Sequence, residues 1–193
     1  ELEVKKFPDS ETYVRFKVPL KGKTVILVQS FYGEVNDDLI ECMFASRTAK
    51  ELGARKVIMA APYFPYLRQD KRFKDGEAVS IHIIGDFASH FWDEIYVVDP
   101  HLHREKQLNH IFSIPAHKIT ADPLIAKYIK KNIKNPIIIG PDVESYKWAE
   151  RTAEIIGCES AILEKTRHSS RKVSVRLNKK IKIKKKNIVI VDD

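Results

Sequence analysis

The chain is poor in glycine, the residue that builds phosphate-binding nucleotide loops. It holds only 7 glycines in 193 residues, and neither a GxxxxGK[ST] loop nor a GxGxxG turn follows its first apolar run. P-loop kinases and enzymes with the dinucleotide fingerprint are therefore disfavoured. No GxSxG or cysteine nucleophile motif is present either, so the familiar hydrolase signatures are also missing.

Cysteines and long apolar runs are also scarce. Cys42 and Cys158 are the only cysteines, and neither has metal-type spacing, so a buried free thiol in a reducing cytosol is favoured for Cys42. No apolar stretch approaches the roughly 20 residues of a membrane span, and the charged N-terminal residues contain no signal-peptide core. We expect a cytoplasmic protein without membrane contact. Because the first residue is Glu1, the natural start is expected to precede it.

Positive charge, in contrast, is abundant. The formal net charge is +8, and the basic excess concentrates in residues 165–186. Nucleic-acid binding, anionic substrates or a thermophile-like surface would each explain such a charge. Lysines alternate with apolar residues in this segment, which favours a β-ribbon with a solvated face. A phosphate-facing role for one or two of the lysines is the alternative, and nucleic acid is the least favoured partner.

Three apolar runs each end in an acid. They are Ile95–Val98 before Asp99-Pro100-His101, Pro136–Pro141 before Asp142, and Asn187–Val191 before Asp192-Asp193. Runs without alternation are typical of parallel strands that are buried on both faces. Ligands of open α/β sheets gather beyond the carboxyl ends of the strands. The pattern therefore predicts a Mg²⁺ site together with a polyol or phosphate site.

Strand and helix patterns alternate along the chain, which favours a mainly parallel α/β sheet. Strands are predicted at residues 23–30, 56–61, 95–98, 137–139 and 160–164, and strict alternation at 172–177 predicts an antiparallel strand. A soft domain boundary is expected near residues 114–120.

Capping residues place four predicted helices between these strands. The first is opened by Asn36-Asp37-Asp38, closed by Gly53, and turns Leu39, Ile40, Met43, Phe44 and Leu52 to the core. The second turns Ile81, Ile84, Phe87, Ala88 and Phe91 inward. The third spans residues 123–133 after an Asp122 N-cap, with Pro123 at its first position. The fourth spans about 144–156 and ends at Gly157.

The loop at residues 63–78 is the densest polar and aromatic cluster. Arg68 and Lys71 suit phosphate oxygens, Gln69 suits a base or ribose, and Tyr63 or Phe64 offers a stacking face. Loops of this length are usually functional or disordered, and the aromatic residues argue against disorder. A plain surface loop is the alternative.

Several further motifs are ambiguous when taken alone. Asp99-Pro100-His101 suits Mg²⁺, which needs only one or two protein ligands when phosphates supply the rest. Asp142 and Asp192-Asp193 serve equally well as helix caps. Residues 164–172 resemble a mobile cationic phosphoryl-transfer loop or a solvated hairpin. Phe7-Pro8-Asp9-Ser10-Glu11 reads as a turn before a strand.

Taken together and in order, the motifs resemble one family, ribose-phosphate pyrophosphokinase, and its archaeal members most of all. The resemblance rests on Phe7-Pro8-Asp9-Ser10-Glu11, Pro62-Tyr63, Tyr66–Lys71, Gly76–Ser80, Val98–His101, Pro141-Asp142, Glu164–Arg167 and Ile188–Asp193. It implies two similar phosphoribosyltransferase-type α/β domains, at 1–117 and 118–193, each with a mainly parallel sheet flanked by helices.

The resemblance also implies an activity and a role for each motif. The diphosphoryl group of Mg–ATP would pass to the 1-hydroxyl of ribose 5-phosphate, releasing AMP, in a homo-oligomer that shares its ATP site between adjacent subunits. No nucleic acid would be a partner. For ATP, the resemblance implies binding by Arg68, Gln69, Lys71 and His101, and contact with a neighbouring subunit's ATP by Phe7, Asp9 and Glu11. It implies association with Mg²⁺ for His101 and Asp142. Transition-state stabilisation is implied for Lys165 and Arg167, and ribose 5-phosphate binding for Asp192 and Asp193.

The chain departs from the family pattern at several places. It stops before the Thr-Gly-Gly-Thr turn that follows the Asp-Asp pair, so the chain as given is expected to be inactive. The family's first strand and helix are expected to precede Glu1. Val-Glu-Ser follows Asp142 where many members carry glycines, and Pro100 replaces the commoner Leu. A non-catalytic regulatory subunit, a type I phosphoribosyltransferase and a basic nucleic-acid-binding domain are the alternatives.

Overall fold

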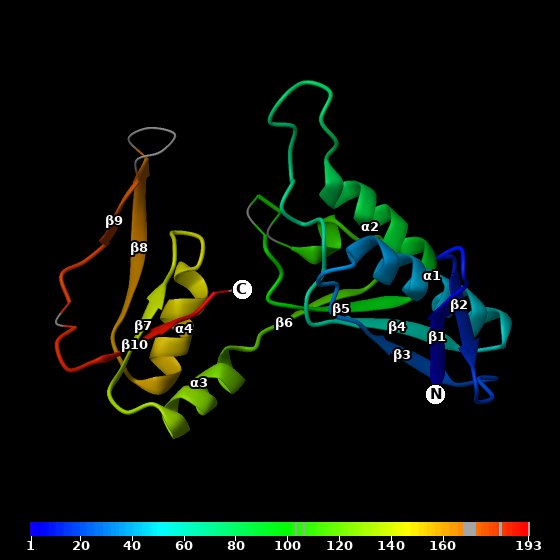
Figure 1. Cartoon of the computed structure of the whole chain (residues 1–193), viewed down its shortest axis with the longest axis horizontal. Coiled ribbons are helices and arrows are strands. Elements are labelled where there is room, and N and C mark those ends of the chain that lie inside the picture. Colours follow the sequence, from blue (N-terminus) through cyan, green and yellow to red (C-terminus); the bar gives the residue numbers. More distant parts are fainter. Residues whose placement is uncertain (103, 106, 168–172, 182, 193) are drawn as a thin grey trace. The chain divides into compact units, whose positions relative to one another are not determined.

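The computed structural model describes residues 1–102, 104–105, 107–167, 173–181 and 183–192, without the side chains of 165–167 and 173. The chain divides into two units, Glu1–Ile119 and Thr120–Asp193. Each unit contains a four-stranded sheet, and unit 1 also carries a two-stranded hairpin (Figure 1). The division lies two residues after the expected end of the first domain at residue 117. The mainly parallel α/β fold is confirmed.

Unit 1 is built on a parallel sheet with the strand order β3-β4-β5-β6. Its elements are β1 (Leu2–Lys6), β2 (Thr12–Phe16), β3 (Thr24–Val28), α1 (Val35–Glu51), β4 (Lys56–Ala61), α2 (Ser80–Phe91), β5 (Glu94–Val98), the short 3₁₀ helix η1 (Leu108–His110) and β6 (Ala116–Ile119). Helices α1 and α2 lie on the same face of the sheet (Figure 1). Sheet residues on one face therefore pack against α1 and α2, whereas residues on the opposite face do not.

Burial in β5 follows these two faces. Ile95 and Val97 are fully buried, whereas Tyr96 and Val98 are half-buried. On β3, Ile26 and Val28 are 59% and 69% exposed. The prediction that unalternating runs are buried on both faces is therefore wrong for β5. The physical reason is that, among the described residues, α1 and α2 cover only one face of this sheet.

Helix α1 begins one residue before its expected cap. Glu34 is the residue at the N-cap position, and it makes no side-chain cap. The Asn36-Asp37-Asp38 cap is therefore wrong: Asp37 pairs with Lys6 of β1, and Asn36 accepts a hydrogen bond from the Tyr66 hydroxyl. These tertiary contacts take the polar side chains away from the helix amides. Gly53 ends the helix with a φ of +81°, as predicted.

The buried stripe of α1 consists mainly of small residues. It is formed by Leu39, Cys42, Ala45, Ser46 and Ala49. Ile40, Phe44 and Leu52, which were expected in the core, are 39%, 42% and 49% exposed. The predicted burial of Cys42 is confirmed, and desolvation raises the pKa of its thiol to about 12. The thiol is therefore protonated at neutral pH, as a structural cysteine should be.

An aromatic cluster joins the helices of unit 1 to the loop after β4. Trp92 is 1% exposed and lies 6.1 Å, centroid to centroid, from Phe64, which also packs edge-on against Phe31 at 5.6 Å. The Trp92 Nε1–H donates to Ser46 Oγ at 2.9 Å. Edge-to-face ring pairs and a satisfied indole N–H are favourable beyond the area they bury. The cluster therefore anchors one end of the loop in the core.

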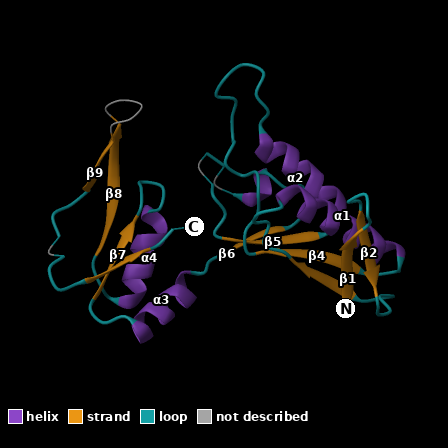
Figure 2. Ribbon diagram, viewed as in Figure 1, coloured by secondary structure: helices purple, strands orange, loops and turns teal. Residues whose placement is uncertain are grey.

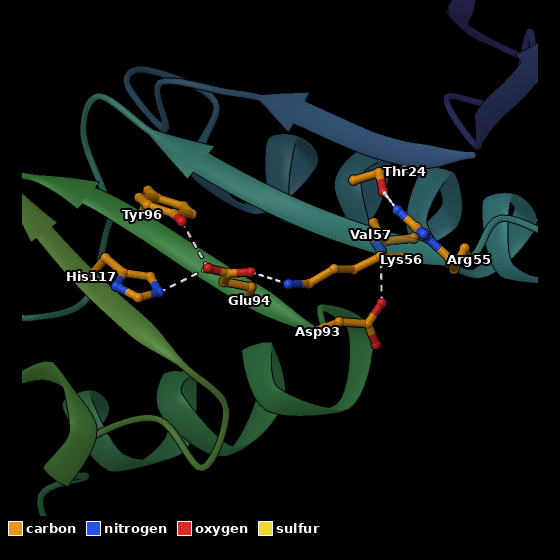
Figure 3. Close-up of polar contacts among 8 residues, drawn as sticks. All are labelled: Thr24, Arg55, Lys56, Val57, Asp93, Glu94, Tyr96 and His117. Carbon is orange, nitrogen blue, oxygen red and sulfur yellow. Dashed lines mark hydrogen bonds and ion pairs between the residues drawn. The ribbon is translucent and has the colours of Figure 1, made fainter. Parts of the chain in front are cut away.

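A polar cluster lies on the sheet face that α1 and α2 leave uncovered (Figure 3). Glu94 accepts hydrogen bonds from the Tyr96 hydroxyl at 2.7 Å and from Lys56, and it pairs with His117 Nε2 at 2.8 Å. The Tyr96 and His117 rings stack with centroids 4.5 Å apart. The Lys56 hydrogen bond first, and the Tyr96 bond next, lower the pKa of Glu94 to about 2. Strands β4, β5 and β6 are thus tied by one carboxylate.

This lowered pKa predicts an acid-sensitive contribution to stability. Because the pKa of Glu94 in the folded state lies below its ordinary value of 4.5, its contribution is complete above that value and is lost as the pH falls towards about 2. Urea unfolding should show Glu94→Gln to be less stable than the unaltered protein at pH 7, with a smaller difference at pH 3.

Glu51→Gln is the matched control for this experiment. Glu51 pairs with Arg47 on the exposed face of α1, where the two side chains are 62% and 73% exposed. Exposed pairs contribute little to stability, so this variant should unfold like the unaltered protein at both pH values. An effect of Glu94→Gln that is equal at pH 7 and pH 3 would contradict the ionic origin of the contribution.

Unit 2 has the strand order β10-β7-β8-β9. Its elements are α3 (Asp122–Asn132), β7 (Pro136–Gly140), α4 (Tyr146–Ile156), β8 (Ser160–Arg167), β9 (Val173–Leu177) and β10 (Asn187–Ile190). β7 is parallel to both β10 and β8, and β9 is antiparallel to β8, as the alternation at 172–177 predicted. Gly157 ends α4 with a φ of +82°, which confirms the predicted stop.

Two expectations for unit 2 are wrong. Ile188 and Ile190 are 53% and 63% exposed, because β10 is the terminal strand of this sheet as far as the structure describes it, with β7 as its neighbour. Asp122 is not an N-cap but the first residue of α3; it is 1% exposed and pairs with Arg151 Nε at 3.2 Å. Its carboxylate therefore joins α3 to α4. None of the described helices is long and apolar enough to cross a lipid bilayer.

Candidate functional site

The loop between β4 and α2 begins at the carboxyl end of a central strand (Figure 2). Phe64 and Leu67 are 3% and 2% exposed and hold its first half against the core. Between these anchors and α2, Arg68 and Lys71 are exposed and Gln69 is half-buried. The loop is therefore an ordered segment that presents polar side chains, not a disordered connection.

The second half of the loop is closed by its own hydrogen bonds. The Glu77 carboxylate accepts from the backbone N–H groups of Phe73 and Lys74 at 2.9 and 3.1 Å, and Arg72 Nε donates to the Glu77 carbonyl at 2.9 Å. The Lys71 ammonium lies 5.0 Å from the centroid of the Phe73 ring. This exposed cation–π contact is weak, so Lys71 remains accessible to an anionic ligand.

The segment after β5 lies beside this loop, because β4 and β5 are neighbours in the sheet. Asp99 has a φ of +37°, and its N–H donates to the Ile119 carbonyl at 2.9 Å. Pro100 is buried and His101 is half-buried. Arg104 returns to the loop and donates to the Asp70 carboxylate. The polar residues after β4 and those after β5 thus share one edge of the sheet.

The turn at residues 7–11 forms the tip of the β1–β2 hairpin. The Phe7 N–H donates to the Glu11 carbonyl at 2.8 Å, and Asp9 Oδ1 accepts from the Glu11 N–H at 3.2 Å. Phe7 is 47% exposed, and Asp9 and Glu11 are exposed. The interpretation as a turn beside a strand is correct. All three side chains remain open to a second molecule.

Asp142 lies between β7 and α4 and caps the turn there. Its Oδ1 accepts from the backbone N–H groups of Glu144 and Ser145, each at 3.0 Å. The buried Ser145 hydroxyl donates to the Asp142 carbonyl at 2.7 Å, and a Cβ on Gly140 would lie 2.5 Å from Ser145 Oγ. Helix α4 begins at Tyr146, and the residue at its N-cap position is Ser145, without a side-chain cap, so the interpretation of Asp142 as a helix cap is wrong: its carboxylate closes the turn before the helix. Ser145 was not singled out from the sequence, although a Ser three residues after an Asp is a common turn signal.

The cationic motif of unit 2 falls in a strand rather than a loop. β8 continues to Arg167, and the backbones of Lys165 and Arg167 lie opposite Val175 and Val173 of β9. Of the two interpretations of residues 164–172, the loop is wrong for residues 164–167, because the alternating residues of β9 extend the ladder as in a hairpin, and residues 168–172 lie outside the described residues. The side chains of Lys165 and Arg167 lie outside the described residues.

The ribose motif follows the edge strand β10. The Val191 N–H donates to the Ile139 carbonyl at 3.1 Å, which carries the parallel ladder one residue past β10. Asp192 is exposed, and Asp193 lies outside the described residues. The carboxyl ends of β7 and β10 thus bring Asp142 and Asp192 to the same edge of this sheet. Among the described residues, no group of three or more His, Cys, Asp and Glu side chains forms a metal cage.

Comparison with known proteins identifies both units. A family model described as the N-terminal domain of ribose phosphate pyrophosphokinase matches residues 1–90, and a phosphoribosyl transferase domain model matches residues 107–193. Ribose-phosphate pyrophosphokinase of Methanothermobacter thermautotrophicus is 37% identical over the whole chain, which covers 66% of that protein. The Pyrococcus furiosus protein of the same name is 38% identical, with 67% covered.

A solved structure agrees with these relatives. The crystal structure of phosphoribosylpyrophosphate synthetase from Mycobacterium smegmatis superimposes with a TM-score of 0.82 at 26% identity, covering 100% of this chain and 62% of that chain. The chain therefore spans about two thirds of the length of its relatives. Since relatives up to 38% identical align over its full length and two domain models match it in order, the chain belongs to the ribose-phosphate pyrophosphokinase family.

Proposed function

We propose that the full-length protein transfers the diphosphoryl group of Mg–ATP to ribose 5-phosphate. The O1 hydroxyl of the sugar would attack the β-phosphorus, the bond between the α,β-bridging oxygen and that phosphorus would break, and AMP would leave with the electron pair. The hydroxyl proton would pass to solvent. The observation that carries the proposal is the ordered match of both domains to this family, with the motif residues at strand ends or on the adjoining strand β8.

Unit 1 would bind the nucleotide. Arg68 and Lys71 are exposed cations suited to phosphate oxygens, and the half-buried Gln69 can hydrogen-bond a base or ribose. Phe7, Asp9 and Glu11 would contact the adenine of a neighbouring subunit's ATP. Their exposure at a hairpin tip supports that role, and a homo-oligomer would then be needed to complete each ATP site.

Magnesium would arrive with ATP and keep most of its oxygen ligands from phosphate and water. His101 in unit 1 and Asp142 in unit 2 would associate with it. When bound, the ion would neutralise phosphate charge and orient the transferred group.

Unit 2 would bind the sugar and complete the charge neutralisation. Asp192 and Asp193 would accept hydrogen bonds from the ribose hydroxyls, since ionised carboxylates are strong acceptors. Lys165 and Arg167 would act on the charge that develops during transfer, because phosphoryl transfer depends mainly on positioning and electrostatic stabilisation. We place the reaction in the cytoplasm, with no nucleic acid among its partners.

An AMP-release assay tests this proposal. The full-length protein with Mg²⁺, ATP and ribose 5-phosphate should release AMP well above a control without the sugar. Omitting Mg²⁺ should abolish the release. If AMP stays at the control level although ATP binds, the protein would be a nucleotide-binding regulatory subunit and the enzymatic proposal would be wrong.

A further inference from the structure

One carboxylate in the loop after β4 is almost completely withdrawn from solvent. The Asp70 side chain is 2% exposed, although Arg68, Lys71 and Arg72 around it are exposed. Both of its oxygens contact a single residue: Arg104 Nη1 lies 2.7 Å from Oδ1, and the Arg104 backbone N–H donates to Oδ2 at 3.1 Å. A charge this buried requires such partners.

The pair joins two segments that end neighbouring strands. Asp70 stands between Gln69 and Lys71 after β4, and Arg104 stands three residues beyond His101 after β5. On the far side of the loop, the Gln69 carbonyl accepts from the Ile81 N–H at 3.3 Å. The loop is thus tied to α2 through its backbone and to the His101 segment through Asp70.

The pair is charged at neutral pH. Burial raises the pKa of Asp70, but the backbone and side-chain hydrogen bonds from Arg104 and its positive charge together outweigh burial, so the pKa lies below its ordinary value. Removing the Arg104 side chain would leave a desolvated anion that only backbone amides stabilise. The cost of such an orphaned charge is far larger than the value of an exposed pair.

We propose that Asp70 and Arg104 form a positioning clasp that holds Arg68 and Gln69 beside His101 before ATP arrives. This inference rests on the proposed function. In this role neither residue contacts the nucleotide. Asp70 holds the backbone of its neighbours Gln69 and Lys71 in position, and Arg104 holds the Asp70 carboxylate in position. Preorganisation of this kind saves the ordering cost that binding would otherwise pay.

The clasp predicts a selective loss of nucleotide affinity. In the full-length protein, Arg104→Ala should raise the Kd of Mg–ATP, measured by calorimetry, and the KM for ATP by about tenfold. The KM for ribose 5-phosphate should stay unchanged. Arg104→Lys should recover part of the affinity, because lysine restores the charge without the planar fork of donors.

Two further variants separate the clasp from general damage. Asp70→Asn together with Arg104→Ala should bind ATP no more weakly than the worse single variant, since both changes break one interaction. Arg55→Ala is the matched control: Arg55 is also in unit 1, but its guanidinium contacts Thr24 Oγ1 at 3.3 Å, just before β4. It should bind ATP normally.

The outcomes distinguish the clasp from the proposed function. If the unaltered protein binds ATP and Arg104→Ala binds it equally well, the clasp is wrong and the proposed function stands. An equal rise in the KM values of both substrates would also overturn the clasp. If the unaltered protein binds no ATP, the proposed function fails, and amide hydrogen exchange then tests the clasp. Faster exchange over residues 66–72 in Arg104→Ala would support the clasp, and unchanged exchange would overturn it.

Discussion

Lys165→Ala in the full-length protein should lower kcat by about 10³-fold, while the KM values for ATP and ribose 5-phosphate change only a few-fold. Charge accumulates on the transferred diphosphoryl group and on the departing AMP oxygen only as the reaction proceeds. A cation that acts on that charge contributes little to ground-state binding. Arg167→Ala, which removes the second cation of the same strand, should behave similarly. Steady-state assays of AMP release give both constants.

Arg176→Ala is the matched control for these variants. It removes a cation from β9, the partner strand of β8, but Arg176 Nε already pairs with Glu164 Oε2 at 3.1 Å and its side chain is 77% exposed. Its kcat should stay within about twofold of the unaltered value. A Lys165→Ala protein that lost only affinity, with kcat intact, would assign Lys165 to ground-state binding.

Periodicity was enough to predict the elements that have one clear apolar face. Residues 56–61 form β4 as expected, and α2 buries Ile81, Ile84 and Ala88. The antiparallel arm β9 follows from its strict alternation. These patterns are local, because each residue's side is fixed by its neighbours two, three or four positions away.

The failures have a common physical origin. Whether β5 and β10 are buried on both faces depends on which helices and strands pack against them. A run of Ile and Val does not predict those tertiary neighbours. Asp122 is a residue type that commonly caps helices, yet its buried carboxylate forms an ion pair with Arg151 of α4 instead. Capping propensity is a weak local preference, and a tertiary ion pair overrides it.

In the candidate site, too, local patterns could be predicted from the sequence and tertiary contacts could not. Its motif residues were predicted from their types and from the family resemblance that their order carries, because cations, carboxylates and imidazole are the groups that bind phosphate and magnesium, and their roles stay predictions. The residues that support them were not. Arg104 was unremarkable in sequence because its partner Asp70 is 34 positions away, and Ser145 acts through the turn at Asp142. Support depends on folded distance, so it becomes visible only in three dimensions.

Trp92→Ala should reduce the free energy of unfolding by about 3–5 kcal/mol. Trp92 follows α2 and is the largest fully buried side chain in the protein's described part. Its loss would leave a cavity among the rings of Phe31 and Phe64, and it would strip Ser46 Oγ of its donor. Urea unfolding at neutral pH measures the change.

The same substitution should also weaken ATP binding, because Phe64 is an anchor of the loop that carries Arg68 and Gln69. Trp92→Phe is the control: it keeps most of the aromatic volume and loses only the indole donor, so about 1–2 kcal/mol should be lost. Calorimetry should then show ATP affinity falling for Trp92→Ala and holding for Trp92→Phe. Equal destabilisation by both variants would mean that the Ser46 hydrogen bond, not ring packing, holds the cluster together. Unchanged ATP affinity in a destabilised Trp92→Ala protein would mean that the Asp70–Arg104 pair positions the loop without help from the core.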